Sequence, residues 1–181
     1  MHSILSVGSL LLSLVLSPQS APKAPQAQHL VGVSPSALKA FDSVAIGECK
    51  VINLKNASGI PDLPHLTDRL ISRLDQKRFS YKKLNSDTEN PAGRVPESTL
   101  VLSAELNAFR SAETGDVIFA ISVIGSSKAM VPNNRGTYQA TFYTRTTVGR
   151  KSGNATSYID GEVAQLVDLF IDDWRAEHRT R

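Results

Sequence analysis

The chain has 181 residues and a single cysteine, so it cannot form an internal disulfide, and its length suits one domain with its own core. Its 20 basic and 17 acidic residues give a net charge of +3. These charges are mixed along the chain and form no basic arm, which argues against a nucleic-acid-binding protein.

The first element is an apolar run over residues 4–16, composed of Leu, Val, Ile, Gly and Ser without a charge. A helix of that length is too short for the ~30 Å hydrocarbon core of a membrane, which takes ~20 residues. We therefore expect a secretory signal peptide over residues 1–20, cleaved between residues 17 and 27, that sends the chain to the periplasm or the medium. The mature form is then expected to have no membrane span. An uncleaved anchor is the alternative, whereas lipidation is not expected because the only cysteine, Cys49, lies far downstream.

Residues 21–33 predict a flexible tether, because their Pro, Ala and Gln content buries too little apolar surface to order the segment. Residues 34–181 are expected to form a single domain. It begins with a short helical turn near residues 35–41, followed by a strand over residues 44–54 with a bulge at its only glycine, Gly47. Cys49 in that strand is interpreted as a small buried hydrophobe.

Two amphipathic helices are predicted. Between residues 64 and 77, leucines recur at helical spacing after Asp62, which can cap free amides, and after a proline suited to a first turn. A second apolar stripe, which ends with Phe170 and Trp174, predicts a helix near the carboxyl end. The two aromatic residues are interpreted as its core anchors.

Between the helices, the hydrophobic period changes to two, which predicts strands over residues 79–84, 100–109, 117–124 and 138–148. Gly125-Ser126-Ser127 is expected to end the third of these strands. The order β-α-β-β-β-β-α predicts an α+β fold, a two-layer sandwich with a mostly antiparallel sheet and both helices on one face.

The sequence offers no pattern for catalysis, cofactor binding or metal binding. The candidate ligands His29, His65 and His178 have no Cys or His partner at ligand spacing. No Gly-x-Ser-x-Gly elbow is present, so any Ser–His chemistry depends on His65. We therefore assign no catalytic, cofactor-binding or metal-binding residue.

Two weaker features leave alternatives open. Asp168, Asp172 and Asp173 lie close together on the last helix, where they either hold a cation or form a solvated face, and the solvated face is the simpler explanation. The segment Gly149-Arg150-Lys151-Ser152-Gly153-Asn154 precedes that helix. It is either an anion site at the helix entrance or an ordinary turn.

The segments Phe41-Asp42-Ser43-Val44-Ala45-Ile46 and Val167-Asp168-Leu169-Phe170-Ile171-Asp172-Asp173-Trp174 complete the pattern of signal, strand, helix, strands and last helix. In this element order the chain resembles small exported bacterial envelope proteins, including lipoprotein-like domains and the amino-terminal domain of TolB. The resemblance implies a periplasmic or exported accessory domain. It brings no catalytic residue with it.

We therefore expect an exported, non-enzymatic accessory domain that binds a protein or a cell-envelope component and needs no cofactor. The loop over residues 85–97 and the free edge of the sheet are the expected contact regions. One alternative is a small secreted hydrolase with an unrecognised site, in which any Ser–His chemistry depends on His65. The other is a weak binder of anionic envelope polymers through basic side chains, namely Lys77, Arg78, Lys82, Lys83, Arg150 and Lys151. The sequence leaves the oligomeric state open.

Overall fold

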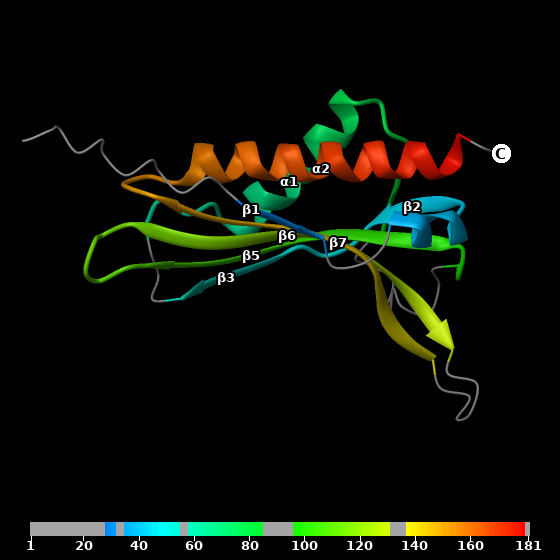
Figure 1. The fold of residues 1–181 in the computed structure, drawn as a ribbon, viewed down its shortest axis with the longest axis horizontal. Coiled ribbons are helices and arrows are strands. Elements are labelled where there is room, and N and C mark those ends of the chain that lie inside the picture. The colour runs from blue at the N-terminus through cyan, green and yellow to red at the C-terminus, as the bar shows by residue number, and fades with distance from the viewer. Residues whose placement is uncertain (1–27, 32–34, 55–57, 85–95, 131–136, 180–181) are drawn as a thin grey trace, which may run out of the picture.

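The computed structural model describes residues 28–31, 35–54, 58–84, 96–130 and 137–179. These residues form two layers, a long sheet and a pair of helices, α1 (Leu63–Gln76) and α2 (Thr156–His178), that lie together on one face of it (Figure 1). The predicted α+β class and the placement of both helices on one face are confirmed. No helix in the described part of the chain is both long and apolar enough to cross a membrane.

Seven strands form one sheet in the order β1-β7-β6-β5-β2-β4, and β3 joins it beside β5. The strands are β1 (Gln28–Val31), β2 (Ser43–Ile46), β3 (Lys50–Leu54), β4 (Lys82–Lys83), β5 (Thr99–Arg110), β6 (Val117–Met130) and β7 (Thr137–Lys151), and a 3-10 helix η1 (Pro35–Ala40) precedes β2. β5, β6 and β7 form the expected antiparallel meander, but β2 and β3 pair with β5 in parallel. The sheet is therefore mixed, because α1 lies between β3 and β5 in the chain and allows a parallel return.

The predicted strand over residues 79–84 is reduced to the two residues of β4, which pair in parallel with β2 and not with β5. The start of that segment instead completes the end of α1. The Phe79 N–H donates to the Leu74 carbonyl at 3.0 Å, and its ring packs against Phe170 of α2 with the ring centroids 5.7 Å apart. Phe79 is thus committed to the layer between the helices and is not available for strand pairing.

The predicted strand over residues 44–54 is two strands, β2 and β3. Three residues after β2 stand opposite two residues of β5, and the extra residue breaks the pairing. The break falls at Gly47, where the sequence predicts a bulge, and the Gly47 N–H donates to the Leu102 carbonyl at 2.8 Å. Cys49 in the same break is buried, as expected, and its Sγ accepts a hydrogen bond from the Ala104 N–H at 3.4 Å.

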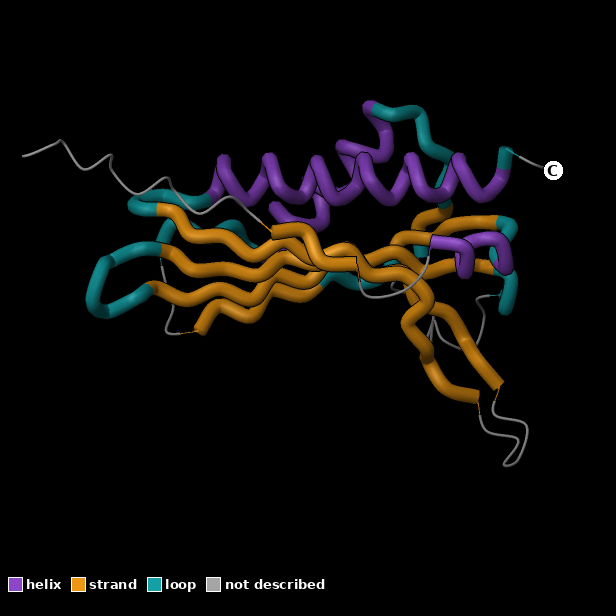
Figure 2. The backbone as a smooth tube through the Cα atoms, viewed as in Figure 1, coloured by secondary structure: helices purple, strands orange, loops and turns teal. Residues whose placement is uncertain are grey.

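β6 continues through Gly125-Ser126-Ser127, so the strand end predicted there is wrong. A register shift between Gly125 and Ser126 bends the strand and lets its pairing with β7 continue. The Ser127 hydroxyl donates to the Thr99 carbonyl at 2.9 Å and ties the bend to β5. Beyond it, β6 and β7 project from the sheet as a two-stranded arm (Figure 2).

Residues 28–31, inside the predicted tether, form β1, which pairs antiparallel with β7 and places Leu30 opposite Thr146. The prediction of a flexible tether is therefore wrong for residues 28–31. The backbone groups of an open sheet edge can pair with a short segment of almost any composition. Residues 1–27, which hold the predicted signal peptide, lie outside the described residues. So do residues 85–95 of the expected contact loop.

The core lies between the sheet and the two helices. It is formed by fully buried side chains of α1, β5 and α2, namely Leu66, Leu70, Leu74, Leu100, Leu102, Leu106, Val163, Leu166 and Phe170. Asp62 caps α1 as predicted, since its Oδ1 accepts from the His65 N–H at 2.9 Å. The core thereby positions the carboxyl-terminal ends of α1 and α2, which border the candidate site.

Candidate functional site

The histidine candidate for hydrolysis is paired with an aspartate. His65 lies in the first turn of α1, as predicted, and its Nε2 lies 2.8 Å from Asp160 Oδ1 of α2. In the described part of the chain, no serine hydroxyl lies within hydrogen-bond distance of that ring. The pair therefore lacks the nucleophile that a Ser–His mechanism needs, and it acts as a link between the helices. His29 lies in β1.

His178 is predicted at a frayed helix end, but the structure holds it firmly. Its ring stacks on Trp174 with the centroids 4.2 Å apart, Nδ1 lies 2.8 Å from the Trp174 carbonyl, and Nε2 lies 2.8 Å from the Phe41 carbonyl. These contacts fasten the end of α2 to the segment before β2. Among the described residues, no group of three or more His, Cys, Asp or Glu side chains is close enough to hold a metal ion.

The carboxylates of α2 do not form the predicted solvated face. Asp168 accepts two hydrogen bonds from Arg73 of α1, one of them 2.8 Å long, and lies 3.4 Å from Lys77 Nζ. Partial burial opposes ionisation of Asp168, but Arg73 and then Lys77 outweigh it and hold the pKa of that carboxyl below its ordinary value. The prediction is wrong here because α1 lies alongside this face, and it holds only for the exposed Asp172.

Asp173 is likewise engaged, on the side of α2 that faces β7. Its Oδ2 accepts from the Tyr143 hydroxyl at 2.9 Å and from Arg145 Nη2 at 2.7 Å. Tyr143 is fully buried, and this burial raises the pKa of its phenol, so the hydroxyl remains a donor at neutral pH. A cation site at Asp168 and Asp173 is not supported, because oxygens of both carboxylates already accept hydrogen bonds from protein donors.

The segment 149–154 is only partly a loop, because β7 extends through Lys151. Arg150 Nε donates to one oxygen of Asp116, and the Ser152 hydroxyl donates to the other at 2.6 Å. These hydrogen bonds, from Ser152 first and then Arg150, hold the pKa of the Asp116 carboxyl below its ordinary value. The cation that an anion site would use is thus bound to a carboxylate, which favours the ordinary-turn interpretation.

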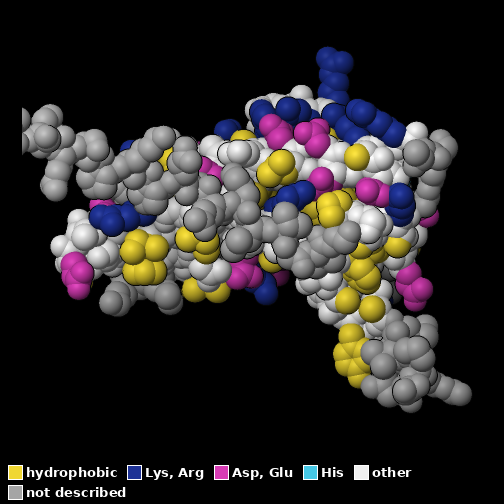
Figure 3. All heavy atoms as spheres, viewed as in Figure 1, with side chains coloured by type: hydrophobic (Ala, Val, Ile, Leu, Met, Phe, Trp, Pro, Cys, Tyr) yellow, Lys and Arg dark blue, Asp and Glu magenta, His cyan; other side chains and the backbone are white. Residues whose placement is uncertain are grey.

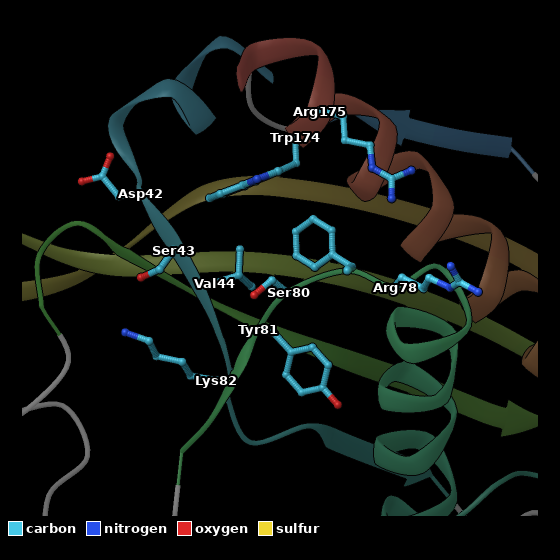
Figure 4. Close-up of a pocket in the computed structure, with 10 residues that line it drawn as sticks. Asp42, Ser43, Val44, Arg78, Ser80, Tyr81, Lys82, Trp174 and Arg175 are labelled. Carbon is cyan, nitrogen blue, oxygen red and sulfur yellow. The ribbon is translucent and has the colours of Figure 1, made fainter. Parts of the chain in front are cut away.

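A cavity of about 320 Å³ opens where α1 ends, between β2, the chain that enters β4, and the last turns of α2 (Figure 4). Its lining combines three cations, Arg78, Lys82 and Arg175, with the aromatic rings of Phe79, Tyr81 and Trp174. We call this cavity the cationic–aromatic pocket. Figure 3 shows basic side chains gathered where α1 ends above α2.

The wall of the pocket is a helix-ending turn. The Arg78 N–H donates to the Asp75 carbonyl at 2.9 Å, and the next N–H reaches back to the carbonyl of Leu74, which is the pattern of a Schellman motif. Arg78 has a φ of 52°, in the left-handed region where this motif usually places glycine. Among the described residues, Arg78 is the only non-glycine residue with a positive φ.

The charges of the pocket are unbalanced. Within the described chain, Arg78 and Lys82 have no hydrogen-bond or ion-pair partner for their side chains, and Arg175 donates one hydrogen bond, to the Lys77 carbonyl at 3.1 Å. One carboxylate, Asp42, also lines the pocket, and Figure 4 shows its carboxylate and the Lys82 ammonium directed to one side of the cavity and the Arg78 guanidinium to the other. Three cationic side chains against one carboxylate can attract an anion.

The sequence pattern identified only part of this pocket. Arg78 and Lys82 belong to the predicted basic set, but Arg175 comes from α2 and was missed, because only the packing of the helices brings it there. Lys77 is paired with Asp168, and Arg150 lies in β7, where it is bound to Asp116. The six predicted basic residues therefore do not form one surface.

Comparison with known proteins identifies no family. No family model and no curated protein matches the chain. Among solved structures, a singly substituted form of the PelC dodecamer from Paraburkholderia phytofirmans has a TM-score of 0.49 and 14% sequence identity over 80% of this chain and 98% of that chain. A second structure of that dodecamer has a TM-score of 0.40 and 10% identity over 82% of this chain and 97% of that one. A neuraminyllactose-binding hemagglutinin homolog from Helicobacter pylori has a TM-score of 0.31 and 15% identity over 78% of this chain and 86% of that one. At these scores, no function or assembly is transferred to this chain.

Proposed function

We propose that this chain is an exported accessory domain that acts by binding a protein partner in the cell envelope. The uncharged apolar leader supports export, and the resemblance to exported envelope domains in element order agrees with it. The observation that carries the binding role is an apolar band on the outer face of the sheet, the face turned away from α1 and α2.

The apolar band crosses four strands. Ile52 of β3, Phe109 of β5 and Val148 of β7 are 42%, 38% and 44% exposed. Phe109 stands opposite Ile118 of β6, and Ala120 of β6 stands opposite Val148, so that these side chains share one face. Figure 3 shows hydrophobic side chains reaching the surface along the lower side of the sheet.

Charged residues border the band. Lys50 stands opposite Glu105 on the same face, and Arg150 stands opposite Ile118. An apolar centre with a charged rim is the usual composition of a protein–protein contact, and a polar polymer would gain little from the centre. Beside the band, β5 is the strand that β3 pairs with among the described residues.

A photo-crosslinking residue placed at Phe109 tests the protein contact in intact cells. We expect one discrete adduct, which disappears when Val148 is replaced by Asp. The control position is Leu63, an exposed apolar residue on α1 with 39% exposure. An equal adduct from Leu63, or none from Phe109 and Ile52, would contradict the proposed contact.

Export is tested separately. Intact mass measurement of protein recovered from the periplasm or medium should show an amino terminus between residues 18 and 28. Full-length protein retained in the cytoplasm would contradict export without bearing on the contact surface.

A second candidate function is supported by one specific observation. Arg78, Lys82 and Arg175 are among the residues that line the cationic–aromatic pocket, and their positive charge supports binding of an anionic ligand. This retains the polymer-binding alternative in a narrower form, with one site in place of six scattered cations.

A further inference from the structure

We propose that His178 is a pH-sensitive latch: it holds the end of α2 against the segment before β2 while both nitrogens of its ring carry a proton, and it releases that segment as the pH rises. The latch consists of His178 and the two carbonyl groups that its ring contacts, those of Trp174 and Phe41. The inference goes beyond the proposed function, because it involves neither the apolar band nor an anionic ligand.

The two acceptors around the ring define its protonation. Nδ1 lies 2.8 Å from the Trp174 carbonyl oxygen, and Nε2 lies 2.8 Å from the Phe41 carbonyl oxygen. A carbonyl oxygen only accepts hydrogen bonds, so each ring nitrogen has to donate one. A neutral imidazole has a single N–H in either tautomer and satisfies only one of the two carbonyls. The doubly protonated imidazolium is therefore the form that fits this geometry.

Two further features of the position of His178 favour the charged ring. It stacks on Trp174 with the ring planes 15° apart and the centroids 4.2 Å apart. A cation over the face of an indole is attracted by the negative charge of that face. His178 is also the last residue of α2, where the helix dipole favours a positive charge.

Both sides of the latch are held by other contacts. Phe41 is buried, and its ring packs edge-on against Phe142 of β7 with the centroids 5.1 Å apart. Trp174 packs edge-on against Phe79 with the centroids 6.0 Å apart. Loss of the proton therefore breaks one hydrogen bond and does not simply move its acceptor. The bond to Trp174 lies within α2, so the bond to Phe41 is the one whose loss separates the two elements.

His178 is the group of this contact that changes charge near neutral pH. Lys39 Nζ of η1 lies 3.2 Å from Glu177 Oε2, so these two charges offset each other next to His178 in the fold. Histidine is the side-chain type whose ordinary change of charge falls between about pH 5 and pH 8. The other charged side chains around the end of α2 are of types that ordinarily keep their charge in that range, namely Lys39, Asp42, Arg145, Asp173, Arg175, Glu177 and Arg179.

The direction of the pH effect follows from the proton count. The latch is complete at acid pH, and it loses one hydrogen bond as the pH rises through the range in which histidine releases its proton. Trp174 and Asp42, the residue after Phe41, both line the cationic–aromatic pocket. Release of the latch therefore loosens one wall of that cavity together with the last turn of α2.

The proton on the ring can be followed through the fluorescence of Trp174, the only tryptophan of the chain, because a protonated imidazole in contact with an indole quenches its emission. We expect the emission to rise along a one-proton curve from about pH 5 to about pH 8. His178→Phe keeps a ring on Trp174 but carries no proton, so its emission should stay flat. His65→Gln is the matched control, since it removes a histidine of α1 and should keep the rise. A flat curve in the parent chain, or an unchanged rise in His178→Phe, would overturn the proposal.

Nitrogen-15 NMR of the imidazole ring tests the hydrogen bonds directly. At about pH 5, His178 should show N–H signals from both ring nitrogens, because hydrogen-bonded protons exchange slowly with water, whereas the exposed ring of His65 should not show both. A missing N–H signal on either nitrogen of His178 would overturn the two-carbonyl arrangement.

Amide hydrogen exchange tests the release of the helix end. Protection of the amides of residues 175–179, measured relative to the intrinsic exchange rate at each pH, should fall about tenfold from about pH 5 to about pH 8, which is the equivalent of one lost hydrogen bond. The amides of residues 163–167 in the same helix are the internal control and should keep their protection. In His178→Phe, residues 175–179 should have the lower protection at both pH values. An equal loss of protection in both segments, or no loss in either, would overturn the latch.

Discussion

Arg73 of α1 and Asp168 of α2, 95 residues apart in the chain, form a two-point ion pair across the line where the helices meet. Both side chains are 27% exposed, so water screens the pair only in part. The pair adds a polar link to the buried apolar packing that holds α2 against α1.

Replacing Asp168 by Asn should reduce the free energy of unfolding by about 1 kcal/mol, because a charged hydrogen-bonded pair becomes a neutral one. Asp172→Asn is the matched control, since Asp172 is exposed on the same helix and should change stability by less than about 0.5 kcal/mol. Urea unfolding measures both. Equal losses of unfolding free energy in the two variants would show that the Arg73–Asp168 pair contributes no more than any carboxylate on this helix.

The stability of the domain should decrease at low pH, in part because Asp168 becomes protonated. The pKa of Asp168 lies below its ordinary value in the folded state, and so does that of Asp116. A lowered folded pKa contributes stability that is present above the unfolded value of about 3.9 and is lost as the pH falls through the folded value. Urea unfolding at a series of pH values should therefore show declining stability below about pH 4. Asp168→Asn should make that decline shallower, and an unchanged slope would contradict its assignment to this carboxyl.

Tyr143 combines a buried ring with a bound hydroxyl, and the two can be separated. Tyr143→Phe removes the 2.9 Å hydrogen bond to Asp173 but leaves Arg145 on the same oxygen, so we expect a loss of about 1 kcal/mol. Tyr143→Ala also empties the space against Phe170 and should cost about 3 to 5 kcal/mol. Thermal unfolding compares the two. If Tyr143→Phe lowers the stability as much as Tyr143→Ala does, the hydroxyl and not the ring accounts for the contribution of Tyr143.

Local patterns predict the helices and the meander because each depends on near neighbours in the chain. The spacing of Leu66, Leu70 and Leu74 and the Asp62 cap define α1 without knowledge of the rest of the fold. The direction of β2 and β3 beside β5 has no such local signal, since it depends on where α1 returns the chain. The continuation of β6 past Gly125 was missed because a glycine and two serines are typical of both a turn and a bulge.

The candidate site was predictable only where its residues are close in sequence. Arg78 and Lys82 stood out as a basic cluster, but the third cation, Arg175, is contributed by another helix. The same reason explains the misassigned carboxylates. Asp168 looks solvated on a helical wheel, and only the packing of α1 beside α2 supplies Arg73 as its partner.

Gly149 should tolerate no side chain. It stands opposite Phe119 on the core face of the sheet, and a Cβ added there would lie 2.9 Å from Cε1 of that fully packed ring. Gly149→Ala should therefore cost about 1 to 3 kcal/mol. Gly161→Ala is the control, and it is expected to stabilise the domain. Gly161 lies on an exposed part of α2, and no atom lies within 4 Å of a Cβ added there. It should gain about 0.5 to 1 kcal/mol in chemical unfolding. A neutral Gly149→Ala would show that Phe119 can move away.

The strain at Arg78 can be measured without any ligand. Arg78→Gly should raise the free energy of unfolding by about 0.5 to 1 kcal/mol, because glycine adopts the φ of 52° without a Cβ clash. Arg78→Ala is the matched control: it removes the guanidinium but keeps the strained backbone, so its stability should stay near that of the parent chain. A glycine variant no more stable than the alanine variant would mean that the left-handed turn is unstrained. Greater stability of the glycine variant alone would show that a side chain at this turn costs stability.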